Sequence, residues 1–203
     1  MTVSITHKTR QVIVVHGLFG SGESLQRLIN HAGADSINVD STRPWAPNLS
    51  EWCDDVTKAH LQCDSAVHIV AHSIGAVPAL KAATLSDSPN VLLLNPFLAH
   101  RWIPHIMNEL DPSSVTVVVG EHDVVTHRQG VAFAKKYGAH VIALPGVSHS
   151  GFLPGTTETW PTPVFMLERL ANRALGRTGP TLSHEDQFNL VGGVIRNHLA
   201  RSN

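Results

Sequence analysis

The pentapeptide Ala71-His72-Ser73-Ile74-Gly75 follows an apolar run and precedes a stretch with helical periodicity. Small residues on both sides of a serine are typical of a tight strand-to-helix turn, because larger side chains would collide there. Such a turn presents the serine hydroxyl as a nucleophile. A serine in this place can also cap the helix by accepting hydrogen bonds from free backbone N–H groups, so the pentapeptide alone leaves both interpretations open.

Three further motifs carry residues that a serine nucleophile would need. They are HGLFG from residue 16, GEHD from residue 120 and PGVSH from residue 145, and each follows an apolar, strand-like run. In an open α/β sheet, ligands bind beyond the carboxyl ends of the strands, so loops distant in sequence meet at one crevice. The four motifs are therefore expected to converge.

The elements that would position these motifs alternate between strand and helix. Strands are expected at 11–15, 37–39, 65–71, 91–94, 115–119 and 140–144, and helices at about 23–31, 75–85, 127–137, 163–175 and 183–200. A further helix begins near Asn48 or Ser50, either of which can cap it, and a Gly/Pro linker covers 176–180. This alternation predicts an α/β fold with one mostly parallel sheet covered by helices on both faces. A single domain over residues 1–203 is expected.

The segment 97–110 is too apolar for an ordinary solvated loop. It contains Trp102, Ile103, Ile106 and Met107. Two interpretations stay open: these residues belong to the core, or the segment is a small cap over a pocket.

Together the motifs resemble those of the α/β-hydrolase family, in which a nucleophile, an acid and a histidine follow successive strands in that order. The resemblance covers residues 11 to about 149 and implies the α/β-hydrolase fold with a minimal cap. It implies Ser73 as nucleophile, Asp123 as acid and His149 as base. Ala71 stands where the commonest GxSxG spelling has glycine, as in some small bacterial lipases and esterases, and alanine still allows close approach.

The expected roles follow from hydroxyl chemistry. Serine needs an adjacent base, and an imidazole with an ordinary pKa of about 6.5 suits that task at neutral pH. Asp123 would fix the tautomer of His149 and stabilise the imidazolium. The backbone N–H groups of Ile74 and Leu18 are the expected oxyanion-hole donors.

Each assignment has an alternative within the chain. Asp123 could instead cap the following helix, with Glu121 as the substitute acid. His184 is the alternative base, although no strand precedes it. His16 and His72 are expected to support the oxyanion loop and the elbow rather than to transfer protons.

Composition excludes several classes of function. The formal net charge is −1 and 15% of residues are charged, which gives no basic surface for nucleic acid. The fourteen histidines form no HExxH motif, and Cys63, His68 and His72 are too far apart along a loop and a strand to share a metal. The first loop reads GxxGxG rather than GxGxxG, so no nucleotide is indicated. No metal or cofactor is expected.

Location and redox state are also predicted. Two cysteines, Cys53 and Cys63, do not make a disulfide framework and are expected to be reduced. The polar N-terminus has no signal core, and no apolar run approaches the roughly 20 residues of a membrane span. The expectation is a cytoplasmic protein.

The predicted substrate is a small to medium carboxylic ester, or a thioester, bound in an apolar pocket. The expected pocket residues are Phe19, Phe97, Trp102 and Ile106. Two other classes stay open. One is non-hydrolytic chemistry on the same fold, such as a C–C hydrolase, lyase or perhydrolase; the other is a ligand-binding protein with little turnover.

Overall fold

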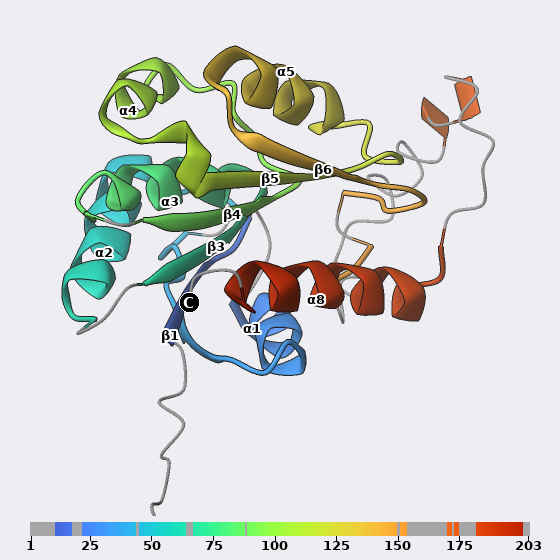
Figure 1. Ribbon diagram of the computed structural model, residues 1–203, viewed down its shortest axis with the longest axis horizontal. Helices are drawn as coiled ribbons and strands as arrows, with labels where there is room; N and C mark the ends of the chain where they lie inside the picture. Colours follow the sequence, from blue (N-terminus) through green and yellow to red (C-terminus); the bar gives the residue numbers. More distant parts are fainter. Residues whose placement is uncertain are drawn as a thin grey trace, which may run out of the picture.

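The computed structural model describes residues 11–17, 22–43, 45–63, 67–87, 89–149, 151–153, 170–171, 173–174 and 182–200. Within these ranges, six strands form one sheet in the order β2-β1-β3-β4-β5-β6, and every neighbouring pair is parallel (Figure 1). The strands are β1 (Gln11–Val15), β2 (Asp35–Asn38), β3 (His68–His72), β4 (Asn90–Leu94), β5 (Val115–Gly120) and β6 (His140–Leu144). The expected parallel sheet is therefore confirmed.

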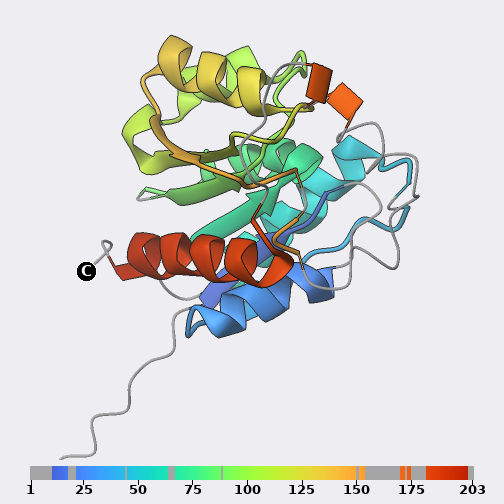
Figure 2. The same ribbon diagram turned by 90° about the vertical axis from the view of Figure 1, so that its right-hand side faces the viewer.

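Helices cover both faces of this sheet. They are α1 (Gly22–His31), α2 (Leu49–Leu61), α3 (Ala76–Ala83), α4 (Ile103–Glu109), α5 (His127–Tyr137) and α8 (His184–Ala200). A 3₁₀ turn, η1 (Ser73–Gly75), joins β3 to α3. Figure 2 shows α1 and α8 side by side on one face, with the other helices on the opposite face.

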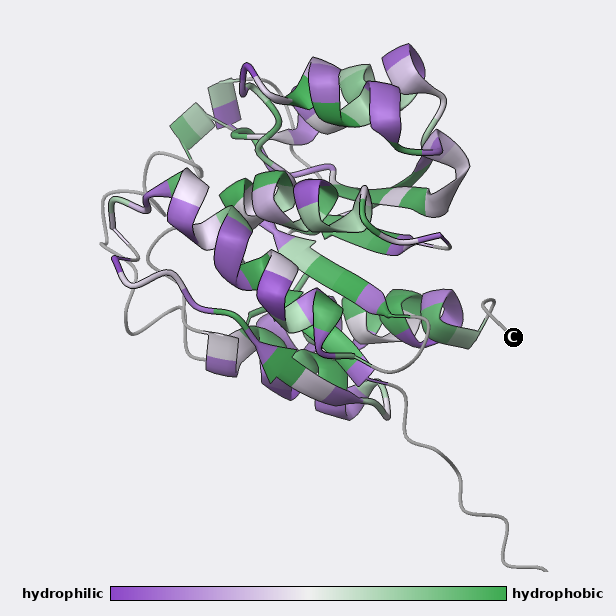
Figure 3. Ribbon diagram, turned by 90° about the vertical axis from the view of Figure 1, so that its left-hand side faces the viewer, coloured by the Kyte–Doolittle hydropathy of each residue, from purple (hydrophilic) through white to green (hydrophobic). Residues whose placement is uncertain are grey.

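The alternation of side chains along the central strands divides the core into two layers. In β1, Val12 and Val14 join a cluster with residues of α1 and α8, whereas Ile13 and Val15 join a cluster with residues of α2, α3 and α4. Because both faces are covered, the central strands are apolar at almost every position. Figure 3 accordingly draws the central strands mostly green and the helices in mixed green and purple.

The chain reverses its direction across the sheet at β1, which pairs with β2 on one side and with β3 on the other. Val15 is in register with Ala71, and His72 with Leu94. The carboxyl ends of these strands therefore meet at one edge. In parallel sheets a ligand site is expected beyond such a reversal point.

Some element boundaries differ from the expectation. The strand expected at 37–39 is Asp35–Asn38, because its register with β1 runs from Gln11 opposite Asp35 to Val14 opposite Asn38. Asn48, rather than Ser50, caps α2, and its side chain accepts a hydrogen bond from the Ser50 N–H at 3.2 Å. The helix expected at 163–175 and the linker at 176–180 lie outside the described residues, apart from 170–171 and 173–174.

The apolar residues of segment 97–110 belong to the core. Ile103, Ile106 and Met107 are buried in the cluster that includes α3, and α4 contacts α3 directly. The core interpretation accounts for most of the apolar character of the segment. That the segment also caps the site stays a prediction.

Two glycines allow a test of the helix ends and interiors. Gly193 lies inside α8 with open space around its missing Cβ, whereas Gly138 ends α5 with a left-handed φ of 80°. Gly193→Ala should raise the free energy of unfolding by about 0.5–1 kcal/mol, because alanine loses less backbone entropy. Gly138→Ala should lower it by about 1 kcal/mol. Urea denaturation measures the free energy of unfolding of both variants. Equal changes of the same sign would contradict the placement of Gly193 inside α8 and of Gly138 at the end of α5.

Candidate active site

The turn that carries Ser73 is backbone-strained and tightly packed. Ser73 has a φ of 54°, in the left-handed region that residues with a Cβ avoid. A Cβ on Gly75 would overlap the His16 and Val15 carbonyl oxygens, and a Cβ on Gly17 would lie 2.8 Å from that of Ser73. The small residues of both motifs therefore let the end of β1 approach the elbow.

Ser73, His149 and Asp123 lie in hydrogen-bonding contact. His149 Nδ1 is 3.0 Å from Asp123 Oδ2, and His149 Nε2 is 3.1 Å from Ser73 Oγ. A carboxylate only accepts hydrogen bonds, so Nδ1 carries the proton and its N–H donates a hydrogen bond to Asp123. In the neutral ring, Nε2 then has a free lone pair and accepts from the Ser73 hydroxyl.

Asp123 has no exposed surface and is held by the turn that precedes α5. Its Oδ1 accepts from the N–H groups of Val125 at 2.8 Å and Thr126 at 2.9 Å, and its Oδ2 accepts from the Thr126 hydroxyl. Burial alone would raise the pKa of this carboxyl. Hydrogen bonds from His149 and Thr126 and the attraction of His149 outweigh it, so the pKa lies below the ordinary value.

The alternative acid and base lie elsewhere. Glu121 and His184 are both exposed, whereas Asp123 and His149 are buried. The carboxylate of Asp123 bonds to the N–H groups of the turn before α5 and to His149 at once. The turn-stabilising and the acid interpretations of this residue are therefore compatible.

Gln187 of α8 holds the loop that bears His149, a role that no pattern in the sequence indicates. Its Oε1 accepts from the Ser148 N–H at 3.0 Å, and its Nε2 donates to the Leu182 carbonyl at 2.8 Å. Gln187 is buried, and a Cβ on Gly151 would overlap its Oε1. A lone glutamine in an amphipathic helix has no distinguishing pattern, so only the packing of α8 identifies it.

The expected oxyanion donors are only partly described. Ile74 lies in η1, at the start of the helical segment, where backbone N–H groups lack acceptors within the helix. Leu18, like the expected pocket residue Phe19, lies outside the described residues. Asp40 contacts residues on both sides of 18–21. Its Oδ1 lies 3.4 Å from His16 Nε2 and accepts a hydrogen bond from the Gly22 N–H at 3.0 Å.

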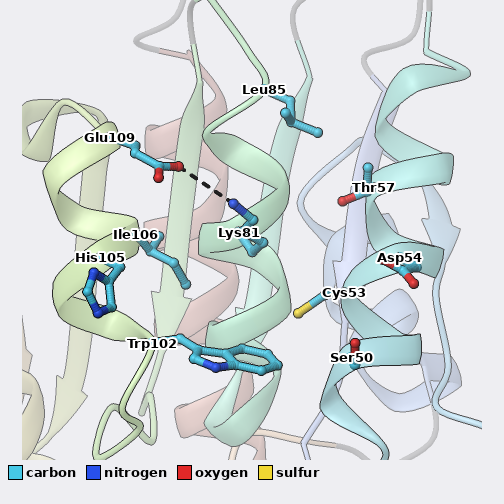
Figure 4. A pocket seen from close by; sticks show the side chains of 10 residues that line it. All are labelled: Ser50, Cys53, Asp54, Thr57, Lys81, Leu85, Trp102, His105, Ile106 and Glu109. Carbon is cyan, nitrogen blue, oxygen red and sulfur yellow. Dashed lines mark ion pairs between the residues drawn. The ribbon is translucent and has the colours of Figure 1, made fainter.

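The structure separates the other expected pocket residues. The Phe97 N–H donates to the Ser73 carbonyl at 2.9 Å, so Phe97 lies beside the elbow. Trp102 and Ile106 instead line a cavity of about 440 Å³ between α2, α3 and α4 (Figure 4). The residues lining that cavity do not include Ser73, Asp123 or His149.

Within the described ranges, no group of three or more His, Cys, Asp or Glu side chains could hold a metal ion. Cys53 and Cys63 are not joined in a disulfide. Burial, followed by the nearby Asp54, raises the pKa of Cys53 to about 11. None of the helices in the described part of the chain is long and apolar enough to cross a membrane.

Solved structures of similar shape define the fold. The YdeN gene product from Bacillus subtilis matches with a TM-score of 0.57 at 17% identity, over 78% of this chain and 96% of that one. Dienelactone hydrolase from Anabaena variabilis matches with a TM-score of 0.56 at 13% identity, over 83% of this chain and 86% of that one. A fungal esterase from Rhizomucor miehei matches with a TM-score of 0.53 at 14% identity, over 96% of this chain and 76% of that one. The fold is the α/β-hydrolase fold.

Comparison of the sequence with family models makes the assignment more specific. Residues 12–169 match the model described as serine hydrolase. The match covers most of the chain, and the protein belongs to the serine hydrolase family. Curated protein sequences give no match.

The lowered pKa of Asp123 predicts a pH-dependent contribution to stability. A carboxyl whose pKa is lower in the folded state stabilises the fold above its unfolded pKa of about 3.9, and this contribution is lost as the pH falls through the folded pKa. Asp123→Asn should therefore unfold more readily than the wild type at pH 6, and the difference should narrow below about pH 4.

Thr126→Val is the intermediate variant, because it removes only the hydroxyl that bonds to Asp123. Its loss of stability relative to the wild type should be smaller than that of Asp123→Asn, and this difference should narrow over the same pH range. Thermal unfolding from pH 2 to pH 7 gives the stability of the wild type, Asp123→Asn and Thr126→Val. A difference between the wild type and Asp123→Asn that is constant with pH would contradict the assignment.

Proposed function

We propose that the protein hydrolyses a small to medium carboxylic ester, or a thioester, through a Ser73-His149-Asp123 triad and an acyl-enzyme intermediate. The observation that carries the proposal is the position of the His149 imidazole, within 3.1 Å of Ser73 Oγ and 3.0 Å of Asp123 Oδ2. A weak nucleophile, a base and a group that orients the base are thereby in contact.

In the proposed reaction, Ser73 Oγ attacks the substrate carbonyl while His149 Nε2 takes the hydroxyl proton. Asp123 stabilises the imidazolium that results. The tetrahedral intermediate collapses as His149 returns the proton to the leaving alcohol or thiol, which leaves the acyl group on Ser73. Water then attacks the acyl-enzyme with His149 again as base, and the carboxylic acid is released.

The negative charge of the intermediate requires N–H groups already directed at the carbonyl oxygen. We assign this role to the backbone N–H groups of Ile74 and Leu18. The position of Ile74 at the start of the helical segment supports its part, since N–H groups and the helix dipole favour an anion there. Loss of one such donor costs about 3–4 kcal/mol in the barrier.

An ester is the bond to test first. Two structures of the same fold are named an esterase and a dienelactone hydrolase, and the family model is that of serine hydrolases. A small molecule is then the expected partner and no cofactor is needed. We further propose a cytoplasmic location, which fits two cysteines that are not joined in a disulfide.

The nucleophile and base are tested together with a fluorophosphonate probe and p-nitrophenyl esters. The probe should label the wild type at Ser73, and Ser73→Ala should not react. His149→Ala should lower kcat about 10⁶-fold, whereas His184→Ala, at an exposed position, should stay within about twofold of the wild type.

Several outcomes would contradict this proposal. Labelling at another serine would reassign the nucleophile, and loss of activity in His184→Ala but not in His149→Ala would reassign the base. A folded wild type that neither reacts with the probe nor turns over any ester would favour the non-hydrolytic or ligand-binding alternative.

The substrate pocket is tested by chain length. We propose that Phe97 and the cavity residues Trp102 and Ile106 contact the acyl or alcohol group. Trp102→Ala should then lower kcat/KM for octanoyl esters about tenfold more than for acetyl esters, because the longer chain buries more apolar surface. Leu85→Ala, which changes the end of the same cavity opposite Trp102 (Figure 4), is the matched control. An equal effect on all chain lengths would exclude Trp102 from the pocket.

A further inference from the structure

Two residues other than glycine have a positive φ in the described part of the chain, and both lie at strand ends beside the candidate site. They are Ser73, with a φ of 54°, and Asn95, with a φ of 43°. The left-handed region is costly for residues with a Cβ, least so for Asn, and such strain gathers at functional sites. The strain at Ser73 belongs to the nucleophile turn, whereas the strain at Asn95 needs its own explanation.

The side chain of Asn95 connects the loops of the candidate acid and base. Its Nδ2 donates to the carbonyl oxygens of Ser148 and His149, both at 2.9 Å. Its Oδ1 accepts from the Gly120 N–H at 2.7 Å, three residues before Asp123. A primary amide carries two donor hydrogens and an acceptor on one plane, which matches two carbonyls and one N–H. Asn95 is 1% exposed, so these bonds form away from water.

His72 provides a second donor to the same carbonyl. Its Nε2 lies 2.9 Å from the His149 oxygen, and because a carbonyl only accepts, Nε2 carries the proton. Burial, followed by repulsion from His149, lowers the pKa of His72 to about 3. His72 is thus neutral at ordinary pH. The His149 carbonyl therefore accepts hydrogen bonds from side chains at the ends of two adjacent strands, β3 and β4.

Both donors bond to the backbone carbonyl of His149 and not to its ring nitrogens, although the His72 ring also packs 5.0 Å from the His149 ring. The ring must meet Ser73 Oγ and Asp123 Oδ2 at once, at 3.1 Å and 3.0 Å. A shift of the loop by about 1 Å would break this alignment, and misplacement of that size can cost about 10²-fold in rate. A rigid backbone at residue 149 is therefore a condition for the proposed reaction.

We propose that Asn95 and His72 are positioning residues that clamp the His149 carbonyl, and so hold the imidazole between nucleophile and acid. This role rests on the proposed serine-hydrolase function. The left-handed backbone of Asn95 directs its amide to the three backbone groups, which explains why the strain is retained.

Asn95→Gly tests the clamp, because glycine keeps the positive φ without strain and removes only the amide. The kcat for a p-nitrophenyl ester should fall about 10- to 100-fold, while KM changes less than about twofold. In proton NMR, the strongly deshielded Nδ1–H of His149, bonded to Asp123, should shift or vanish through exchange with water. His72→Phe, which keeps an aromatic ring and removes the donor, should change kcat and the resonance in the same direction, by at least about fivefold in kcat.

Val56→Ala in α2 is the control for a loss of stability alone, since Val56 is buried in the core cluster of the opposite sheet face from α8. It should lower the Tm and leave kcat and the resonance as in the wild type. If Asn95→Gly and His72→Phe behave like Val56→Ala, the clamp is wrong. If Asn95→Gly does not fold, His72→Phe decides alone. A wild type without ester turnover would refute the proposed function instead, and the resonance would still test the clamp because it needs no substrate.

Discussion

The arrangement of the site depends on how closely the end of β1 approaches the turn after β3. Gly75 packs against the carbonyl oxygens of Val15 and His16, and Gly17 packs against Ser73, so closely that neither glycine has room for a Cβ. Any side chain at these glycines would push the strand end and the elbow apart. The close approach places His16 and Gly17 beside the turn of Ser73, at the point where the strand order reverses, and Ser73 adopts a strained backbone there.

A second constraint is the number of buried polar groups that must find partners at this edge of the sheet. Asp123 is buried and accepts three hydrogen bonds from its own turn besides that of His149. Ser148, next to His149, is hydrogen-bonded to Gln187, and the His149 carbonyl accepts hydrogen bonds from Asn95 and His72. Buried polar groups without partners are costly, so such a network has one low-energy arrangement. That arrangement holds the imidazole in one orientation.

Helices on the two faces contribute unequally to this network. On one face, α3 begins at the elbow, and α2 and α4 pack around it as core. On the other face, α8 packs against α1, and its Gln187 bonds to the loop of His149, although α8 follows that loop in sequence by more than thirty residues. The C-terminal helix is therefore part of the support of the candidate site as well as of the core.

The sequence by itself determined the sheet, the strand-end position of each motif and the order of Ser73, Asp123 and His149, because hydrophobic period and small-residue turns are local properties. It left open whether segment 97–110 was core, and it assigned nothing to Asn95 or Gln187. Those points depend on contacts between residues far apart in the chain. A hydrogen bond between a side chain and a distant backbone group leaves no periodic trace, so only the tertiary structure decided them.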